Sequence, residues 1–578
     1  MLRASRIHHF GFIRDFVSRW DALALLVVLA LVVFLAEASR GLLEPLSKLD
    51  ATPLSLAPIH LPEYAARTTL RMFTALVLSL AFTLSYATWA AKSPRAARVL
   101  IPLLDILQSV PILGFISITV VFFMSLVPGR VLGAEFAAIF AIFTSQAWNM
   151  AFSFYQSLRT VPTELEEAAA SFHLTPWMRF WQLEVPFGLP ALTWNMMMSM
   201  SGGWFFVVAA ESISVGHTSV ALPGIGSYIA LAIEQRNLHA IGWAITAMAI
   251  VILVYDQLIF RPLICWVDRF RVEDEPGAEP PVSWALTMMR RSRLIGGLTI
   301  AFYAVVRWTS WTLPARAAPA PQPPASRERR SRLVELLWMG AALLMAALAL
   351  RHLALTLLLE THLAELREVF LLGLLTLARV VILIAIASLI WVPIGVWVGL
   401  RPRAAQFVQP IAQFLAAFPA NLLFPLAVYL IVSENLNPDL WLSPLMVLGT
   451  QWYILFNVIA GASAMPAELR RAAQNFGVGG WLWWRRVALP GVFPFFVTGA
   501  ITASGGSWNA AIVAEVATWG TTKLSAHGLG AYIAAATTAG DYHRIVLGIA
   551  AMSLFVVTIN RWFWRPLYYY AERRYRLT

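Results

Sequence analysis

The sequence predicts an all-α polytopic membrane protein built from two tandem six-helix units. Three observations lead to this fold class. The 578 residues are 59% hydrophobic and only 13% charged. Apolar stretches long enough to cross a bilayer of roughly 30 Å as helices recur along the whole chain. Much of the first half also returns in the second half at an offset of 304 residues. Short alternating segments, which are typical of a membrane β-barrel, are not seen.

The apolar stretches predict six spans in each half. In the first half they lie near 22–38, 69–91, 99–126, 133–155, 190–212 and 240–262. In the second half they lie near 333–358, 371–400, 408–432, 440–461, 494–517 and 543–566. An even number of crossings returns each half to the same side, so the two units are predicted to be parallel rather than inverted repeats.

The repeat defines the predicted domains. Matched pairs at the offset of 304 are Trp148/Trp452, Pro186/Pro490, Trp204/Trp508, Glu211/Glu515, Gly224/Gly528, Gly226/Gly530, Tyr228/Tyr532, Arg261/Arg565 and Pro262/Pro566. This indicates a first permease-like domain at 1–271 and a second at 333–578. Residues 272–332 contain a short acidic segment at 273–277 and a proline-rich segment at 314–326, and are predicted to be a linker. Within it Leu294–Val306 is apolar but short and flanked by arginines, which favours an interfacial helix over a span.

Charge indicates topology rather than a polyanionic partner. The net charge is +12, but the basic residues cluster beside the predicted spans. With a cytoplasmic N-terminus, every cluster falls on the cytoplasmic side, as the positive-inside rule requires. We therefore expect a bacterial inner-membrane protein with both termini in the cytoplasm, in contact with lipid and not with nucleic acid. The single cysteine, Cys265, makes a thiolate metal site improbable, and no metal site is predicted.

One cytoplasmic loop occurs twice. Residues 162–169 (Pro-Thr-Glu-Leu-Glu-Glu-Ala-Ala) return as residues 466–473 (Pro-Ala-Glu-Leu-Arg-Arg-Ala-Ala), in both halves between the fourth and fifth predicted spans. A short helix held across the membrane face is a docking element for a cytoplasmic partner. The alternative is an ordinary amphipathic loop helix, which two copies at matched positions disfavour.

This loop resembles the signature of the permease subunits of bacterial ABC importers, called the EAA motif: Glu-Ala-Ala, three residues, Gly, and further on an apolar residue and Pro. In that family the segment is the coupling helix, which sits in a cleft of an ATP-binding subunit. The resemblance implies a type I importer fold, two cytoplasmic ATPase subunits that carry ATP and Mg²⁺, and a periplasmic substrate-binding protein. The coupling residues that it implies are Glu164, Glu167, Ala168, Ala169, His173, Glu468, Arg471, Ala472, Ala473 and Gly477.

The two copies depart from the signature in different ways. His173 stands where glycine is expected in the first, and Arg471 stands where glutamate is expected in the second. We therefore expect the two halves to contribute unequally to coupling. The chain contains no Gly-x4-Gly-Lys-Ser/Thr sequence and no catalytic grouping of Ser, His, Cys or Asp. It is thus expected to hold no cofactor, to hydrolyse no ATP itself and not to be an enzyme.

Further motifs narrow the resemblance to the nitrate, sulfonate, taurine and bicarbonate group. They include Phe418-Pro419 and the segments at 528–533 (Gly-Leu-Gly-Ala-Tyr-Ile) and 224–229 (Gly-Ile-Gly-Ser-Tyr-Ile). The group implies import of a small, anionic solute from periplasm to cytoplasm. Three alternatives stay open: a fused ferric-ion permease, a secondary transporter with parallel repeats, and a membrane scaffold that recruits a protein through its loops.

Polar residues within the third to fifth spans are candidates for the translocation path. They are Gln108, Ser109, Gln146, Asn149, Asn195, Ser201, Gln413, Asn421, Gln451, Thr502, Ser507 and Asn509. Neutral donors suit the brief passage of a small polar solute, whereas each residue alone also fits an interhelical hydrogen bond.

Four charged residues are predicted at the periplasmic side: Arg71, Arg379, Glu211 and Glu515. The arginines could attract an anion into the vestibule, or pair helices. The glutamates could order the Gly-x-Gly loop that follows, or touch the binding protein.

Overall fold

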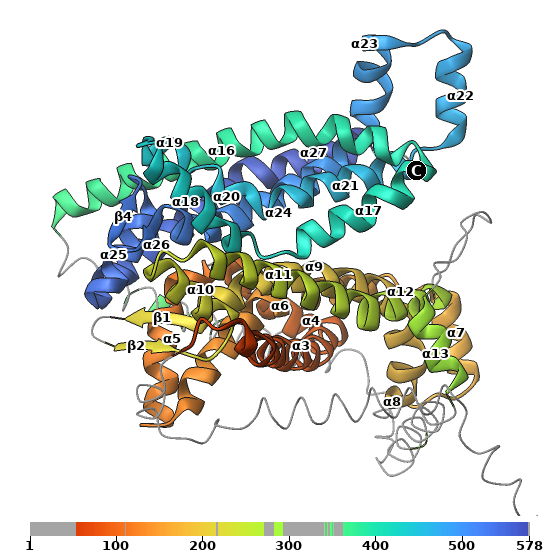
Figure 1. Ribbon diagram of the computed structural model, residues 1–578. Helices are drawn as coiled ribbons and strands as arrows, with labels where there is room; N and C mark the ends of the chain where they lie inside the picture. Colours follow the sequence, from red (N-terminus) through yellow and green to blue (C-terminus); the bar gives the residue numbers. More distant parts are fainter. Residues whose placement is uncertain are drawn as a thin grey trace, which may run out of the picture.

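The structure is a computed structural model, and it describes residues 54–109, 111–215, 218–270, 283–292 and 362–575, with a few single positions between 304 and 351. The predicted spans at 22–38 and 333–358 lie outside the described residues, apart from single positions, as does nearly all of the predicted interfacial helix at 294–306. The remaining chain forms two helical halves that lie against each other (Figure 1).

The first half consists of helices and one hairpin. Its elements are η1 (Pro58–His60), α3 (Leu61–Lys92), α4 (Pro94–Ser109), α5 (Ile112–Leu126), α6 (Val131–Arg159), α7 (Thr163–Ser171), α8 (Pro176–Arg179), η2 (Phe180–Glu184), α9 (Val185–Glu211), β1 (Ser212–Val215), β2 (Thr218–Ala221), α10 (Ile225–Glu234), α11 (Leu238–Tyr255), η3 (Asp256–Phe260), α12 (Arg261–Val267), η4 (Asp268–Phe270) and α13 (Trp284–Arg291).

The second half repeats this order from the second span onward, except that three helices at 438–463 stand where the first half has the single helix α6. Its elements are α16 (Leu363–Gly399), α17 (Pro402–Ala417), η5 (Ala420–Leu423), α18 (Phe424–Ser433), α19 (Pro438–Trp441), α20 (Leu445–Leu448), α21 (Gln451–Ser463), α22 (Ala467–Asn475), α23 (Gly480–Trp483), η6 (Trp484–Ala488), α24 (Leu489–Ala514), β3 (Val516–Trp519), β4 (Thr522–Ser525), α25 (Leu529–Ala539), α26 (Tyr542–Ile559), η7 (Asn560–Trp564) and α27 (Arg565–Tyr575).

The ten predicted spans that fall on described residues each coincide with a helix or a broken helix. By length and hydropathy, six helices within the described ranges can cross a membrane, or up to eight if each bent pair is one span. The spans predicted at 99–126 and 408–432 are each broken, before Pro111 and before Pro419. The second pair bends by 78°. Proline causes these breaks because it lacks an N–H donor and drives the preceding residue out of the helical region.

Local details of the fold repeat at the same offset of 304 residues. The π-helices η2 and η6 are equivalent, and so are η3 and η7. The side chain of Asn237 caps α11, and that of Asp541, its equivalent, caps α26. Antiparallel hairpins pair Ser212 with Ala221 and Val516 with Ser525. The duplication seen in the sequence is therefore a duplication of structure.

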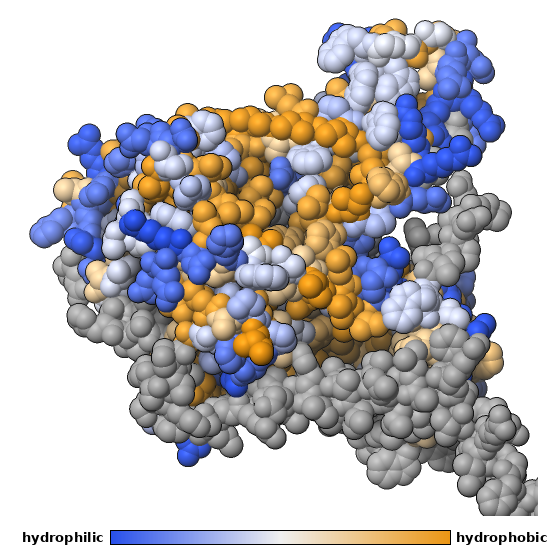
Figure 2. All heavy atoms as spheres, viewed as in Figure 1, coloured by the Kyte–Doolittle hydropathy of each residue, from blue (hydrophilic) through white to orange (hydrophobic). Residues whose placement is uncertain are grey.

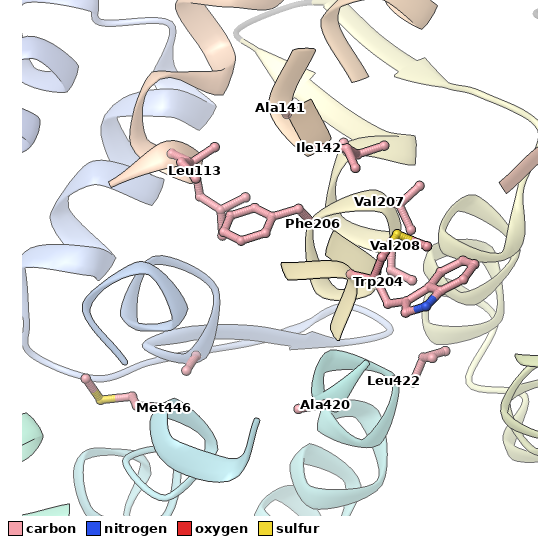
Figure 3. Packing of buried hydrophobic residues seen from close by; sticks show 14 of the residues in the cluster. Leu113, Ala141, Ile142, Trp204, Phe206, Val207, Val208, Ala420, Leu422 and Met446 are labelled. Atoms are coloured by element: carbon pink, nitrogen blue, oxygen red, sulfur yellow. The ribbon is translucent and has the colours of Figure 1, made fainter. Parts of the chain in front are cut away.

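One large hydrophobic core joins the two halves. Trp204 of α9 is fully buried, and its ring centroid lies 5.8 Å from that of Tyr255. Leu113 and Phe206 of the first half belong to the same buried cluster as Leu422 of the second (Figure 3). Because the cluster crosses the boundary, the two halves form one packed unit rather than separate domains.

The two ends of the molecule differ in what they display. The helix pairs α7–α8 and α22–α23 project at one end, and the hairpins lie at the other (Figure 1). On the face shown in Figure 2, hydrophobic side chains cover the middle of the second half along α16. Hydrophilic side chains gather around α22–α23 and, at the opposite end, around α19 and β4. This banding is what a bilayer around the middle requires.

Candidate translocation pathway and coupling loops

The first coupling loop, which we define as residues 162–186, begins with α7 directly after Pro162. The helix ends in a Schellman motif, in which Leu174 N donates to Ala169 O at 3.1 Å and His173 N donates to Ala170 O at 2.9 Å. His173 occupies the left-handed position of this motif, with φ of 52°. Glu164, Glu167 and Ala168 are exposed.

The second coupling loop, residues 466–490, has the same geometry. Val478 N donates to Ala473 O at 2.9 Å, and Gly477 has φ of 65°. The Gly of the signature is therefore explained by backbone conformation, because only glycine adopts this region without steric cost. Glu468 and Arg471 are exposed, and Ala472 is half-buried.

The two loops bury and expose equivalent side chains. Ala169 and Ala473 point inward and are each 6% exposed. Phe172 and Phe476, also equivalent, are 79% and 84% exposed. The sequence reasoning missed these two phenylalanines, although their shared place directly before the signature glycine was a detectable signal. An aromatic side chain held in water at the tip of a rigid turn is suited to fill a pocket on a partner.

A chain of ion pairs ties the first coupling loop to the membrane helices. Arg179 of α8 pairs with Glu166 of α7 and, at 3.1 Å, with the buried Glu184. Glu184 also pairs with Lys92 at the end of α3, at 2.8 Å. These ion pairs connect α7 to α3 and to the start of α9. In the second coupling loop, the equivalents of Glu166, Arg179 and Glu184 are Arg470, Trp483 and Ala488, so this chain of ion pairs is not repeated.

A cavity of about 780 Å³ lies between the halves. Six of the predicted path residues line it: Gln108, Asn149, Asn195, Ser201, Thr502 and Asn509. Both halves build its wall, because Asn509 accepts a hydrogen bond from Ile112 N at 2.7 Å and Ser201 donates to Ala416 O. Gln108 donates to Asn149 at 2.8 Å, which leaves a row of neutral polar groups facing the cavity.

Five other predicted path residues are not among the residues that line this cavity. Gln146 is buried with its amide against the sulfur atoms of Met72 and Met200. Asn421 donates to Phe205 O at 3.0 Å, and Gln451 accepts from Trp391 at 2.9 Å. The remaining pairs are Ser507 with Thr450 and Gln413 with Asp256. These residues hold helices together. The side chain of Ser109 is outside the described part of the structure.

Among the described residues, the cavity lining contains one charged side chain, that of Arg565. Aromatic residues form much of the rest of the wall: Trp148, Phe152, Phe205, Phe206, Phe418, Tyr453, Trp508, Trp564, Tyr568 and Tyr569. The sequence reasoning used Arg565 only as a marker of the repeat and did not foresee this position. Across the described ranges, no three His, Cys, Asp or Glu side chains gather as they would to bind a metal ion.

Arg71 lies in a buried ion-pair cluster near the hairpin end of the first half. It is 3% exposed, contacts both carboxylate oxygens of Glu135 at 2.6 Å and contacts Glu211 at 2.7 Å. Glu211 also accepts from Thr68 and from Gly226 N, both at 2.7 Å. Glu211 thereby orders the Gly-x-Gly segment, and the buried Arg71 is not placed to meet a solute.

The second half repeats this cluster in a more open form. Arg379 contacts Glu515 at 3.2 Å and Asp439 at 2.8 Å, and Glu515 accepts from Ala531 N at 3.0 Å. Asp439 is the equivalent of Glu135 but is 39% exposed, and it also pairs with His527. The sequence reasoning missed Glu135 and Asp439, whose shared offset of 304 was the available signal.

The Gly-x-Gly segments require glycine because of space. A Cβ atom on Gly224 or Gly528 would overlap the carboxylate of Glu211 or Glu515, respectively. One on Gly226 would overlap Val208 O.

Near the second Gly-x-Gly segment, burial and the neighbouring Glu365 carboxylate raise the pKa of Tyr532, whose hydroxyl donates to Glu365 at 3.0 Å. Tyr228, the equivalent of Tyr532, donates to Leu56 O instead.

Comparison with known proteins gives a family match in both halves. Residues 53–260 and 391–574 match the binding-protein-dependent transport system inner membrane component. The chain is 26% identical to a glycine betaine/carnitine transport permease of Listeria monocytogenes over 32% of its own length and 61% of that relative. It is 27% identical to a bicarbonate transport system permease of Synechococcus elongatus over 33% of its length and 68% of the relative. It is also 26% identical to a nitrate import permease of Leptolyngbya laminosa over 32% of its own length and 63% of that relative.

The aligned regions cover only part of each chain. The chain spans less than two thirds of the betaine/carnitine and nitrate relatives. Each alignment covers about a third of this chain, whereas the family match covers both halves.

Proposed function

The chain belongs to the family of binding-protein-dependent transport system inner membrane components, and we propose that it forms the complete permease of an ATP-driven importer. In this proposal it moves a small, anionic solute from the periplasm to the cytoplasm. The inner membrane is the location that the family implies. The observation that carries the proposal is the pair of equivalent loops, α7–α8 and α22–α23, at one end of a molecule whose halves enclose a polar cavity.

The loops are proposed to receive two cytoplasmic ATPase subunits, one at each. Both loops have the same helix, the same left-handed turn and the same exposed phenylalanine. When the ATPases close on ATP, the loops move with them, and α9 and α24 follow because η2 and η6 connect them directly to the loops. This movement would open and close the cavity between the halves. A periplasmic binding protein would deliver the solute at the hairpin end.

The proposed topology follows from these roles. The loop end faces the cytoplasm, as do both chain termini, and the hairpin end faces the periplasm. Residues 1–271 and 333–578 are the two permease units, and residues 272–332 connect them. A fused dimer of this kind brings both halves of the pathway into one chain.

The cavity supports a small anion as the solute. Among the described residues that line it, the polar groups are neutral except for Arg565, and none is a carboxylate. A ferric-ion pathway is disfavoured, because a hard cation needs oxygen ligands that carry negative charge. A proton- or sodium-coupled secondary transporter is disfavoured as well, since the loops would then have no role.

A quaternary ammonium compound is the second candidate solute. Aromatic faces attract such cations, and ten aromatic side chains line the cavity.

Changing Arg565 to Gln distinguishes the anion from the quaternary ammonium compound in proteoliposomes that contain the ATPases and the binding protein. Uptake of an anion should fall about tenfold, whereas uptake of a betaine should be unchanged or faster. Tyr570, exposed but absent from the cavity lining, provides the control Tyr570→Phe.

Co-purification tests the function itself. Arginine introduced at Ala168 and Ala472 should remove ATPase binding and ATP-driven uptake, because both alanines lie on the coupling helices. Gln235→Arg, at the opposite end of the molecule, is the matched control and should leave ATPase binding intact. Retained ATPase binding and uptake in the loop variants would reject the assignment. Uptake that continues after ATP depletion would instead favour the secondary transporter.

A further inference from the structure

The two coupling loops carry opposite charge. Residues 162–186 contain four glutamates and one arginine, whereas residues 466–490 contain one glutamate and four arginines. The charged residues are Glu164, Glu166, Glu167, Glu184 and Arg179 in the first loop, and Glu468, Arg470, Arg471, Arg485 and Arg486 in the second. At two equivalent positions the sign reverses directly, from Glu166 to Arg470 and from Glu167 to Arg471.

Most of these charges are available to a partner. Glu164 and Glu167 are exposed and form no ion pair with the described residues. Arg471, Arg485 and Arg486 are likewise exposed and have no carboxylate partner in the described part of the chain. Arg179 and Lys92 together offset the charges of Glu166 and Glu184, so that Glu164 and Glu167 define the outer charge of the first loop. The electrostatic difference is therefore presented outward.

The shape of the two loops is shared, although the charge is not. Both helices span nine residues and end in the same turn, and the buried alanine and the exposed phenylalanine are equivalent. The common apolar features fit a common kind of cleft. Charge complementarity, by contrast, decides which member of a set of similar clefts is chosen.

We propose that the two coupling loops bind two different ATPase chains, with a cationic cleft at α7 and an anionic cleft at α22. This inference rests on the proposed function and adds the identity of the partners to it. Two copies of one ATPase would offer the same side chains to both loops. A cleft that attracts Glu167 would then repel Arg471, and the like charges would oppose binding at one of the two sites. Two complementary chains remove that conflict and fix which ATPase lies under which half.

Photo-crosslinking from equivalent positions tests the proposal. Ser171 and Asn475 are the last residues of the two coupling helices. Both are exposed, and they are equivalent at the offset of 304. In the full-length chain with Cys265→Ser, Ser171→Cys or Asn475→Cys is labelled with a benzophenone maleimide in membranes of the source organism. Cross-linked chains are identified by mass spectrometry, and an ATPase is recognised by its Gly-x4-Gly-Lys-Ser/Thr sequence. We expect a different ATPase chain at each position, each enriched about tenfold or more over the other.

Charge reversal provides the second measurement. Glu164→Arg with Glu167→Arg should lower capture at position 171 about tenfold and leave capture at position 475 unchanged, and Arg470→Glu with Arg471→Glu should do the reverse. The same ATPase sequence at both positions would overturn the inference. So would arginine variants that keep full ATPase capture but bind phosphatidylglycerol vesicles more weakly, since the arginines would then contact lipid. Capture of no ATPase at either position would instead reject the proposed function itself.

Discussion

At the scale of single residues, His173 and Gly477 show what the signature glycine does. Both residues follow a coupling helix and have a backbone in the left-handed region. Only glycine adopts this conformation without a steric cost of about 1 kcal/mol. The first loop therefore carries a cost that the second avoids. Because nothing else lies within 4 Å of a Cβ added at Gly477, conformation alone sets the preference there.

Gly477→Ala should consequently destabilise the end of α22 by about 1 kcal/mol. Hydrogen exchange of the Val478 amide, which closes the turn, measures this as roughly fivefold faster exchange. Gly479→Ala is the matched control, since Gly479 has negative φ and open space around it. His173→Gly should slow exchange at Leu174 by a similar factor. If Gly477→Ala left exchange at Val478 unchanged and His173→Gly left exchange at Leu174 unchanged, relative to the wild-type protein, this explanation of the turn would be refuted.

Arg71 and Arg379 occupy equivalent places but should differ in importance. Arg71 is buried with two buried carboxylates, whereas Arg379 is 14% exposed and one of its partners, Asp439, is 39% exposed. Removing a buried charge leaves its partners uncompensated, at a cost of about 3 kcal/mol or more. Removing Arg379 should cost less, because solvent can compensate the partly exposed Asp439.

Arg71→Gln should therefore lower the thermal unfolding temperature of the purified protein clearly more than Arg379→Gln does. Arg67→Gln provides the control, because the pair of Arg67 with Glu63 is partly exposed and lies within one helix, where such a pair is worth a few tenths of a kcal/mol. If Arg71→Gln and Arg67→Gln unfolded at the same temperature, the ion-pair cluster would have no role in stability.

At the scale of elements, the hairpins and the helices after them depend on close backbone contact. Gly226 lets α10 approach Val208 of α9, and Gly530 lets α25 approach Ala511 of α24. Glu211 and Glu515 complete each junction by accepting hydrogen bonds from the first turn of the helix.

Gly226→Ala should thus displace α10 and reduce the yield of folded protein, as judged by size-exclusion chromatography in detergent. Gly242→Ala, in the second turn of α11 with no atom near the added Cβ, should be neutral or stabilising by up to about 1 kcal/mol. Similar yields for Gly226→Ala and the wild-type protein would contradict the close approach.

The elements also show where sequence reasoning succeeds. Long apolar runs predicted ten spans in the described ranges. Each falls on a helix or a broken helix, and six to eight of these helices are long and apolar enough to cross a membrane. The breaks at Pro111 and Pro419 were not foreseen, although each is caused by a residue visible in the sequence. The reason is that an apolar run does not reveal on which side of a proline the backbone turns; neighbouring helices decide that. Similarly, Gln108 and Gln146 look alike in the sequence, yet one faces the cavity and the other is buried.

At the scale of the whole molecule, the duplication predicted the repeated loops and the equivalence of Arg71 with Arg379, and the EAA motif within those loops predicted the family. The shared offset of Glu135 and Asp439 marks them as equivalent, but it does not reveal that they pair with the arginines, since pairing across helices depends on packing rather than on spacing. The halves are equivalent in architecture but differ in charge, in the ion-pair chain through Glu184 and in the exposure of the Arg379 cluster. A fused chain allows such divergence, whereas a dimer of identical chains does not.

The measurement that tests the central claim most directly is ATP-driven uptake by the reconstituted transporter after removal of the exposed phenylalanines. Phe172→Ala or Phe476→Ala alone should lower uptake about tenfold or more, and the two together should abolish it, with the ATPases still able to hydrolyse ATP. Trp562→Ala, which removes an exposed aromatic side chain elsewhere, should transport normally. Full ATP-driven uptake by the double variant would contradict the account, because the loops would then not transmit the work of the ATPases.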